Sequence, residues 1–137
     1  DARQTDDETP LHRAAELGHD EAVRILIDAK ATLDIEDSWR GAAIHHAFAR
    51  DHNAVVHSLL AGKASIDVRG SGDKQTILHI AASNGLASSV RELVGAKASV
   101  DVKDASGMTP LHYAATGGDN EILQILLSSR TFIGRQF

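Results

Sequence analysis

Cysteine is absent from this chain of 137 residues, and proline and aromatic residues are scarce. Without a thiol the chain can form neither a disulfide nor a zinc site with thiolate ligands, which excludes a secreted scaffold held together by disulfides. Phenylalanine, tryptophan and tyrosine make up only 4% of the residues. A core must therefore be built from alanine, leucine, isoleucine and valine, which suits small helices that pack closely.

Long apolar runs and an excess of positive charge are also missing. No segment is long and apolar enough to cross a bilayer, so we expect no insertion into a membrane. The 14 lysine and arginine residues are outnumbered by 19 aspartate and glutamate residues, which gives a formal net charge of -5. Because nucleic acids attract basic surfaces, no nucleic acid partner is predicted.

Two short phrases recur along the chain with the same period. The first is DAKATLD at 28–34, AGKASID at 61–67 and GAKASVD at 95–101. The second is TPLHRAA, AAIHHAF, TILHIAA and TPLHYAA, with histidines at positions 12, 45, 79 and 112. Two markers that both step by 33 or 34 residues predict a chain of stacked structural repeats.

Each repeat is interpreted as a helix, a tight loop, a second helix and an extended finger. Thr9 and Thr109 stand where an N-cap hydroxyl is favoured, and a proline follows each at the first helical position. The first helix is expected to end at Gly18, since glycine adopts a left-handed backbone at little cost. A helix pair of this size cannot bury its apolar face alone, so neighbouring repeats are expected to complete the core.

The pattern T-P-L-H-x-A-A-x-x-G, followed by an apolar helix, resembles the ankyrin repeat over nearly the whole chain. The resemblance implies an all-α repeat solenoid, in which an ankyrin-repeat stack of helix-turn-helix units carries β-turn fingers on one side. We place a single ankyrin-repeat domain at 1–137, with repeats at about 9–41, 42–75, 76–108 and 109–137 and the finger of a preceding partial repeat at 1–8. The chain is interpreted as four repeats cut from a longer protein, or trimmed to a stable core.

Eight histidines raise the question of a metal or catalytic site. The resemblance implies instead that the four histidines of the T-P-L-H phrase bond backbone groups between repeats: His12, His45, His79 and His112. It also implies that His19 and His52, in the loop after the first helix, are structural. Neighbouring side chains on a helix diverge by about 100°, so His45 and His46 cannot easily share a metal. No nucleophile stands beside a base, so no enzyme activity, cofactor or metal is predicted.

The resemblance also implies a binding module whose ligand is a partner protein or peptide. Its usual contact surface comprises the finger tips and the outward positions of each first helix, which here are Trp39, Arg40, His46, Arg50, Arg69, Asp73, Lys74, Ile80, Asn84, Lys103, Met108 and Tyr113. Trp39 is the only tryptophan, and tryptophan is enriched in binding hot spots, so we expect it to anchor the partner together with Ile80 and Tyr113. The alternative is that Trp39 packs flat on a neighbouring finger.

Basic residues follow the second helices where ankyrin repeats normally place glycine: Lys30, Lys63, Lys97 and Arg130. A left-handed residue other than glycine costs on the order of 1 kcal/mol. A cation beside the last carbonyls of a helix returns about 0.3–1 kcal/mol. The row is therefore interpreted either as compensation by the helix dipole or as a contact for an acidic stripe on a partner.

Two other functions stay open at this point. One is a structural spacer or an intramolecular regulatory domain of a larger signalling, channel or scaffold protein, whose partners are other domains of its own parent chain. The other is a methyl-lysine reader, although the scattered aromatic residues do not favour the aromatic cage it needs. We expect an intracellular location, in the cytoplasm or the nucleus.

Overall fold

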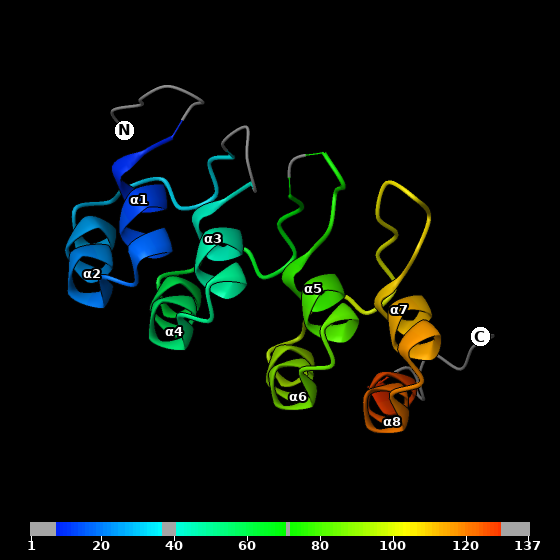
Figure 1. The fold of residues 1–137 in the computed structure, drawn as a ribbon. Coiled ribbons are helices and arrows are strands. Elements are labelled where there is room, and N and C mark those ends of the chain that lie inside the picture. Colours follow the sequence, from blue (N-terminus) through cyan, green and yellow to red (C-terminus); the bar gives the residue numbers. More distant parts are fainter. Residues whose placement is uncertain (1–7, 37–40, 71, 130–137) are drawn as a thin grey trace. The chain divides into compact units, whose positions relative to one another are not determined.

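The structure is a computed structural model and describes residues 8–36, 41–70 and 72–129. These residues form eight α-helices and no strand (Figure 1). The helices are α1 (Pro10–Leu17), α2 (Asp20–Asp28), α3 (Ala43–Ala49), α4 (Asn53–Ala61), α5 (Ile77–Ser83), α6 (Ala87–Gly95), α7 (Pro110–Gly117) and α8 (Asn120–Ser129). Their succession as closely connected pairs confirms the predicted all-α repeat solenoid.

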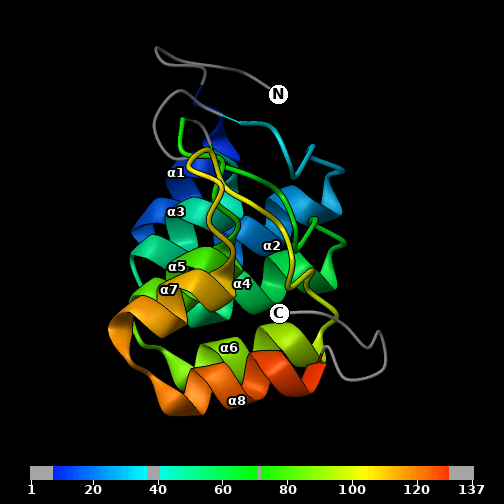
Figure 2. The ribbon, with the colours of Figure 1, turned by 90° about the vertical axis from the view of Figure 1, so that its right-hand side faces the viewer.

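The chain forms two compact units, Asp1–Ile77 and Leu78–Phe137. In the first unit α1 and α3 lie side by side, and α2 and α4 make a second layer next to them (Figures 1 and 2). In the second unit α8 packs against α6 and α7. In each unit the fingers extend from the side of the first helix of a pair (Figure 1). The proposed repeat boundaries and the assignment of a single domain stay predictions.

The first helices begin at the residues that the sequence predicts. Thr9 Oγ1 accepts a hydrogen bond from the backbone N–H of His12 at 3.2 Å, and a proline occupies the first turn of α1. Helix α7 begins in the same way, with Thr109 as the capping residue. Helix α3 has Ala42 at this position and receives no side-chain cap. The second repeat therefore lacks one hydrogen bond that the first and fourth repeats possess.

Left-handed residues follow all four first helices. The φ angles are +77° at Gly18, +65° at Asp51, +71° at Gly85 and +68° at Gly118. The Gly18 N–H donates to the carbonyl of Ala15 at 3.2 Å. The His19 N–H donates to the carbonyl of Ala14 at 3.0 Å. These bonds satisfy carbonyls that the last helical turn leaves open. The predicted stop at glycine is confirmed, and an aspartate takes the same conformation in the second repeat.

Lysine has the equivalent role after the second helices. Lys30, Lys63 and Lys97 are exposed and have φ angles of +69°, +79° and +74°. The Lys30 N–H donates to the carbonyl of Ile27, and the N–H of the next residue donates to the carbonyl of Leu26, both at 3.0 Å. Lysine thus occupies a left-handed capping position usual for glycine. Arg130 lies outside the described residues.

Small and branched aliphatic side chains form the buried core, as the composition predicts. Fully buried examples in the first unit are Leu11, Val23, Ile44 and Leu59, and those in the second unit are Leu78, Val90, Ile122 and Leu126. One close approach involves Gly62 at the end of α4, where an added Cβ would lie 2.9 Å from Ile27 Cγ2. Helices α2 and α4 therefore pack tightly at this point because glycine has no side chain.

Candidate partner-binding surface

A buried histidine in α1 connects this helix to the backbone that follows α2. His12 is 1% exposed. Its Nδ1 accepts a hydrogen bond from the Thr9 N–H at 3.0 Å, and its Nε2–H donates to the Ile35 carbonyl at 2.7 Å. One ring nitrogen accepts and the other donates, so both nitrogens of the imidazole are used.

Two further histidines hold finger carbonyls in the same manner. His45 Nε2–H donates to the Gln75 carbonyl at 2.9 Å, and His79 Nε2–H donates to the Met108 carbonyl at 3.0 Å. Burial lowers the pKa of His45, and the neighbouring His46 lowers it further. The prediction that these imidazoles bond backbone groups is confirmed for both residues, as it is for the histidine of α1.

The loop and terminal histidines give a mixed result. His52 Nε2–H donates to the Glu16 carbonyl at 3.0 Å, and its ring lies where a Cβ on Gly18 would come within 2.8 Å. This confirms a structural role for His52. His112 is exposed, and its Nδ1 accepts the Thr109 N–H at 2.9 Å. A backbone bond from His112 to a further repeat stays a prediction, as does the structural role of the exposed His19.

In the first unit, His46 of α3 and Arg50, the residue that follows this helix, converge on Glu16 of α1. Arg50 Nη2 donates to Glu16 Oε2 at 2.8 Å, and His46 Nδ1 lies 3.9 Å from Glu16 Oε1. The His46 ring also meets the His12 ring edge-on, with centroids 5.3 Å apart. Arg50 is exposed, but His46 is only 3% exposed. The expectation that His46 faces outward is therefore wrong, because side chains of the neighbouring repeat pack against it.

The second finger, residues 64–75, carries three of the predicted contact residues. Arg69, Asp73 and Lys74 are all exposed. The finger is closed by a bond from the Gly70 N–H to the Gln75 carbonyl at 2.8 Å. Arg69 Nε donates to the Lys74 carbonyl at 3.1 Å, and Asp73 Oδ1 accepts the Gln75 N–H at 3.1 Å. Internal bonds thus shape the finger, while Lys74, at φ +61°, has its side chain exposed.

The third finger, residues 98–108, is organised around Asp104. This aspartate is 6% exposed, and its Oδ1 accepts the N–H groups of Ser106 and Met108, both at 2.9 Å. Its Oδ2 accepts a hydrogen bond from the Tyr113 hydroxyl of α7. Sequence reasoning missed this residue, although an aspartate three residues before Gly107 is a typical turn signal.

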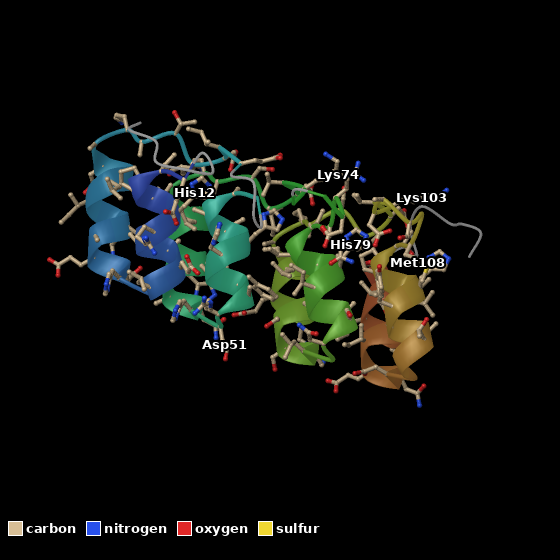
Figure 3. All side chains as sticks on the ribbon, turned by 45° about the horizontal axis from the view of Figure 1, so that its top comes forward. His12, Asp51, Lys74, His79, Lys103 and Met108 are labelled. Atoms are coloured by element: carbon tan, nitrogen blue, oxygen red, sulfur yellow. The ribbon has the colours of Figure 1, made fainter. Side chains whose placement is uncertain are left out.

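The remaining predicted contact residues lie mainly in the second unit. Ile80 and Tyr113 are half-buried, while Asn84, directly after α5, and Lys103 are exposed. His79 bonds to the Met108 carbonyl at the finger end of this unit, where Figure 3 also labels Lys103. Trp39 and Arg40 lie outside the described residues. The other ten predicted contact residues are divided between the two units. His46, Arg50, Arg69, Asp73 and Lys74 lie in the first unit, and Ile80, Asn84, Lys103, Met108 and Tyr113 lie in the second.

Within residues 8–36, 41–70 and 72–129, no three histidine, aspartate or glutamate side chains are grouped so that they could hold a metal ion. In the same part of the chain, no helix has the length and apolar character needed to cross a membrane.

Comparison with known proteins agrees with this architecture. A family model described as ankyrin repeats in three copies matches residues 1–70 and 44–136. The chain belongs to the ankyrin repeat family. Rabankyrin-5 of Mus musculus and of Homo sapiens is 45% identical over 56 residues, which cover 41% of this chain. Protein phosphatase 1 regulatory subunit 12A of Mus musculus is 41% identical over 54 residues, which cover 39% of this chain. The matched segments span only 5% of the length of these relatives.

Proposed function

We propose that this ankyrin-repeat chain is a protein-binding module, which docks a partner protein or peptide on its fingers and on the outward faces of its first helices. The observation that carries the proposal is a division of roles within the fingers. Buried histidines hold the finger backbone, whereas Arg69, Lys74 and Lys103 are exposed on it and take no part in the core. A surface that is already ordered loses little conformational entropy when a partner docks.

One relative supports a role in regulation, since it is named as a regulatory subunit of a protein phosphatase. The proposed action is therefore reversible binding in the cytoplasm or the nucleus, with neither a cofactor nor a metal. Because the relatives are far longer than the matched segment, we keep one alternative. In it, the chain is a spacer or a regulatory domain that contacts other domains of its own parent protein.

A binding experiment with defined variants tests the proposal. The whole chain is immobilised, proteins retained from a cell lysate are identified by mass spectrometry, and one purified candidate is titrated against each variant. Truncation of a hot-spot tryptophan commonly weakens binding by about thirtyfold, so Trp39→Ala should do the same. Lys63→Ala and Lys97→Ala, at the ends of α4 and α6, should leave the Kd nearly unchanged.

The opposite pattern would relocate the site. Loss of binding in the lysine variants, with full binding by Trp39→Ala, would favour an acidic stripe of the partner on the lysines. If no purified candidate binds the whole chain, the spacer alternative is favoured instead.

A further inference from the structure

One asparagine of the chain, Asn84, stands directly before a glycine. The other two asparagines, Asn53 and Asn120, are followed by alanine and glutamate. An asparagine loses its side-chain amide when the backbone nitrogen of the next residue attacks the amide carbon. A glycine at that next position leaves the nitrogen accessible, because no Cβ stands beside it. The sequence therefore distinguishes Asn84 as the asparagine most open to this reaction.

The structure places Asn84 and Gly85 in the loop between α5 and α6. Both residues are exposed, and Gly85 has a φ angle of +71°. Among the described residues other than the direct chain neighbours, only Asp119 Oδ2 comes within 4 Å of a Cβ built on Gly85, at 3.6 Å. The pair is therefore accessible to water on a sparsely packed side of the second unit.

The nitrogen that must attack is held by the longest of four equivalent hydrogen bonds. The residue after each first helix donates its N–H to a carbonyl three residues earlier, and the N–O distances are 3.2 Å at Gly18, 3.1 Å at Asp51, 3.4 Å at Gly85 and 3.1 Å at Gly118. Attack requires this bond to break and the loop to open locally. Because exposed loops open at a small cost in free energy, the Gly85 nitrogen is the one of the four that is released most easily.

We propose that Asn84 is a site of spontaneous deamidation in the folded chain. The Gly85 nitrogen forms a bond to Cγ of Asn84, the bond from Cγ to Nδ2 breaks, and ammonia leaves with the proton that the Gly85 nitrogen gives up. Water then opens the cyclic imide. Addition of water at Cγ yields an aspartate, and addition at the backbone carbonyl yields an isoaspartate. Water is the only other reactant, and the step needs no partner, so the inference goes beyond the proposed function.

Both products change the loop that contains them. Each replaces a neutral amide by a carboxylate and adds one negative charge to a chain whose formal net charge is -5. Isoaspartate also lengthens the backbone between Ala81 and Leu86, which are joined by a hydrogen bond from the Leu86 N–H to the Ala81 carbonyl at 3.0 Å. Deamidation is therefore expected to loosen the end of α5 and to alter irreversibly a residue of the predicted contact surface.

The test incubates the whole folded chain at mildly alkaline pH in water labelled with heavy oxygen. Digestion at acid pH in ordinary water follows, and mass spectrometry of the peptides locates the label, because the oxygen that replaces the amide comes from the solvent of the incubation. A protein isoaspartyl methyltransferase then detects isoaspartate. Asn84 should be labelled at least about tenfold faster than Asn53 and Asn120, a difference of about 1.4 kcal/mol in the barrier. Isoelectric focusing should show the gain of one negative charge.

Two variants separate the loop from the local sequence. Asn84→Gln keeps an amide, but attack on its longer side chain would form a larger ring, so the label and the charge shift should disappear. Gly117→Asn places an asparagine before Gly118, whose N–H bond is shorter, at 3.1 Å against 3.4 Å for Gly85. This variant should deamidate there more slowly than the unmodified chain does at Asn84. If thermal melting shows that Gly117→Asn does not fold, the comparison of the native with the denatured chain still decides.

Three outcomes would count against the inference. If Asn84 were labelled only after unfolding in guanidinium chloride, the folded loop would protect it and the inference would be overturned. Equal labelling of Asn53, Asn84 and Asn120 in the folded chain would overturn it as well. Faster labelling in Gly117→Asn than at Asn84 would overturn the part that rests on the Gly85 hydrogen bond. None of these results bears on partner binding, so the proposed function is tested separately.

Discussion

His79 links three parts of the second unit through a single side chain. It has no exposed surface, its Nε2–H donates to the Met108 carbonyl, and its ring meets that of Tyr113. Since Met108 belongs to the third finger and Tyr113 to α7, the imidazole joins both of them to α5. A residue with this position is expected to contribute to stability rather than to contact a ligand.

We predict that His79→Ala lowers the free energy of unfolding by more than about 1 kcal/mol, because the Met108 carbonyl loses its donor inside the protein. Urea denaturation followed by circular dichroism measures the change. His57→Ala serves as the control, since His57 is exposed on α4 and should shift stability by no more than about 0.5 kcal/mol. Equal losses in the two variants would contradict the role assigned to His79.

The left-handed lysines allow strain and charge to be separated at one residue. Lys63→Gly removes both the backbone strain at φ +79° and the charge near the end of α4. Lys63→Ala removes the charge but keeps the strain. We predict that the glycine variant stays within about 1 kcal/mol of the unmodified chain and that the alanine variant is less stable than the glycine variant by about 1 kcal/mol. Thermal melts that rank alanine level with glycine would show that the left-handed backbone costs nothing here.

At the scale of the element, the loops between paired helices look alike in sequence but differ in their surroundings. Gly18 and Gly118 both follow a first helix with a left-handed backbone. A Cβ on Gly18 would meet the His52 ring at 2.8 Å, whereas a Cβ on Gly118 would meet no atom of the described residues within 4 Å. The first loop therefore carries a packing requirement in addition to its backbone requirement.

We predict that Gly118→Ala costs on the order of 1 kcal/mol from backbone strain alone. Gly18→Ala should cost more, since His52 must also move and weaken its bond to the Glu16 carbonyl. Denaturant titration of the two variants gives the difference directly. If Gly118→Ala proved the more damaging change, the close approach of His52 to Gly18 would not limit stability.

The elements themselves could be predicted from the sequence because their signals are local. The threonine caps, the left-handed stops and the apolar spacing each involve residues within one or two helical turns. The burial of His46 could not be predicted, because it depends on Glu16 and His12 of another helix. The turn around Asp104 has a local signal in Gly107, but its bond to Tyr113 does not, since its second oxygen is satisfied by a side chain of α7.

At the scale of the whole molecule, the repeat period predicts how many helix pairs there are but not how they group. The division between Ile77 and Leu78 falls inside the T-I-L-H phrase, where no change of composition marks it. Grouping depends on the packing between elements, which a repeated local pattern does not specify. The candidate surface is affected in the same way, because its residues are distributed over both units.

Acid is expected to weaken the whole fold through at least two groups. Asp20 at the start of α2 accepts a hydrogen bond from Ser58 of α4 at 2.6 Å and is paired with Arg24. The Ser58 hydroxyl and then Arg24 lower the pKa of Asp20 from its ordinary value of 3.8. Because the pKa of this carboxyl is lower in the folded chain, its ionised form stabilises the fold above pH 3.8. This stabilisation is lost as the pH falls through the lowered pKa of Asp20.

His45 produces a loss of stability at milder pH. Burial, with a further contribution from His46, lowers its pKa from the ordinary value of 6.5, so the folded chain takes up fewer protons at this residue than the unfolded chain does. The free energy of unfolding should therefore fall as the pH drops below 6.5, and the fall from this residue should end below its lowered pKa. Urea denaturation at about pH 7.5 and about pH 5.5 measures the effect. His45→Gln, which cannot titrate, should show a smaller difference between the two pH values, whereas His57→Ala should keep the full difference. An unmodified chain that becomes more stable on acidification, or a His45→Gln variant with an unchanged pH dependence, would rule out His45 as the cause.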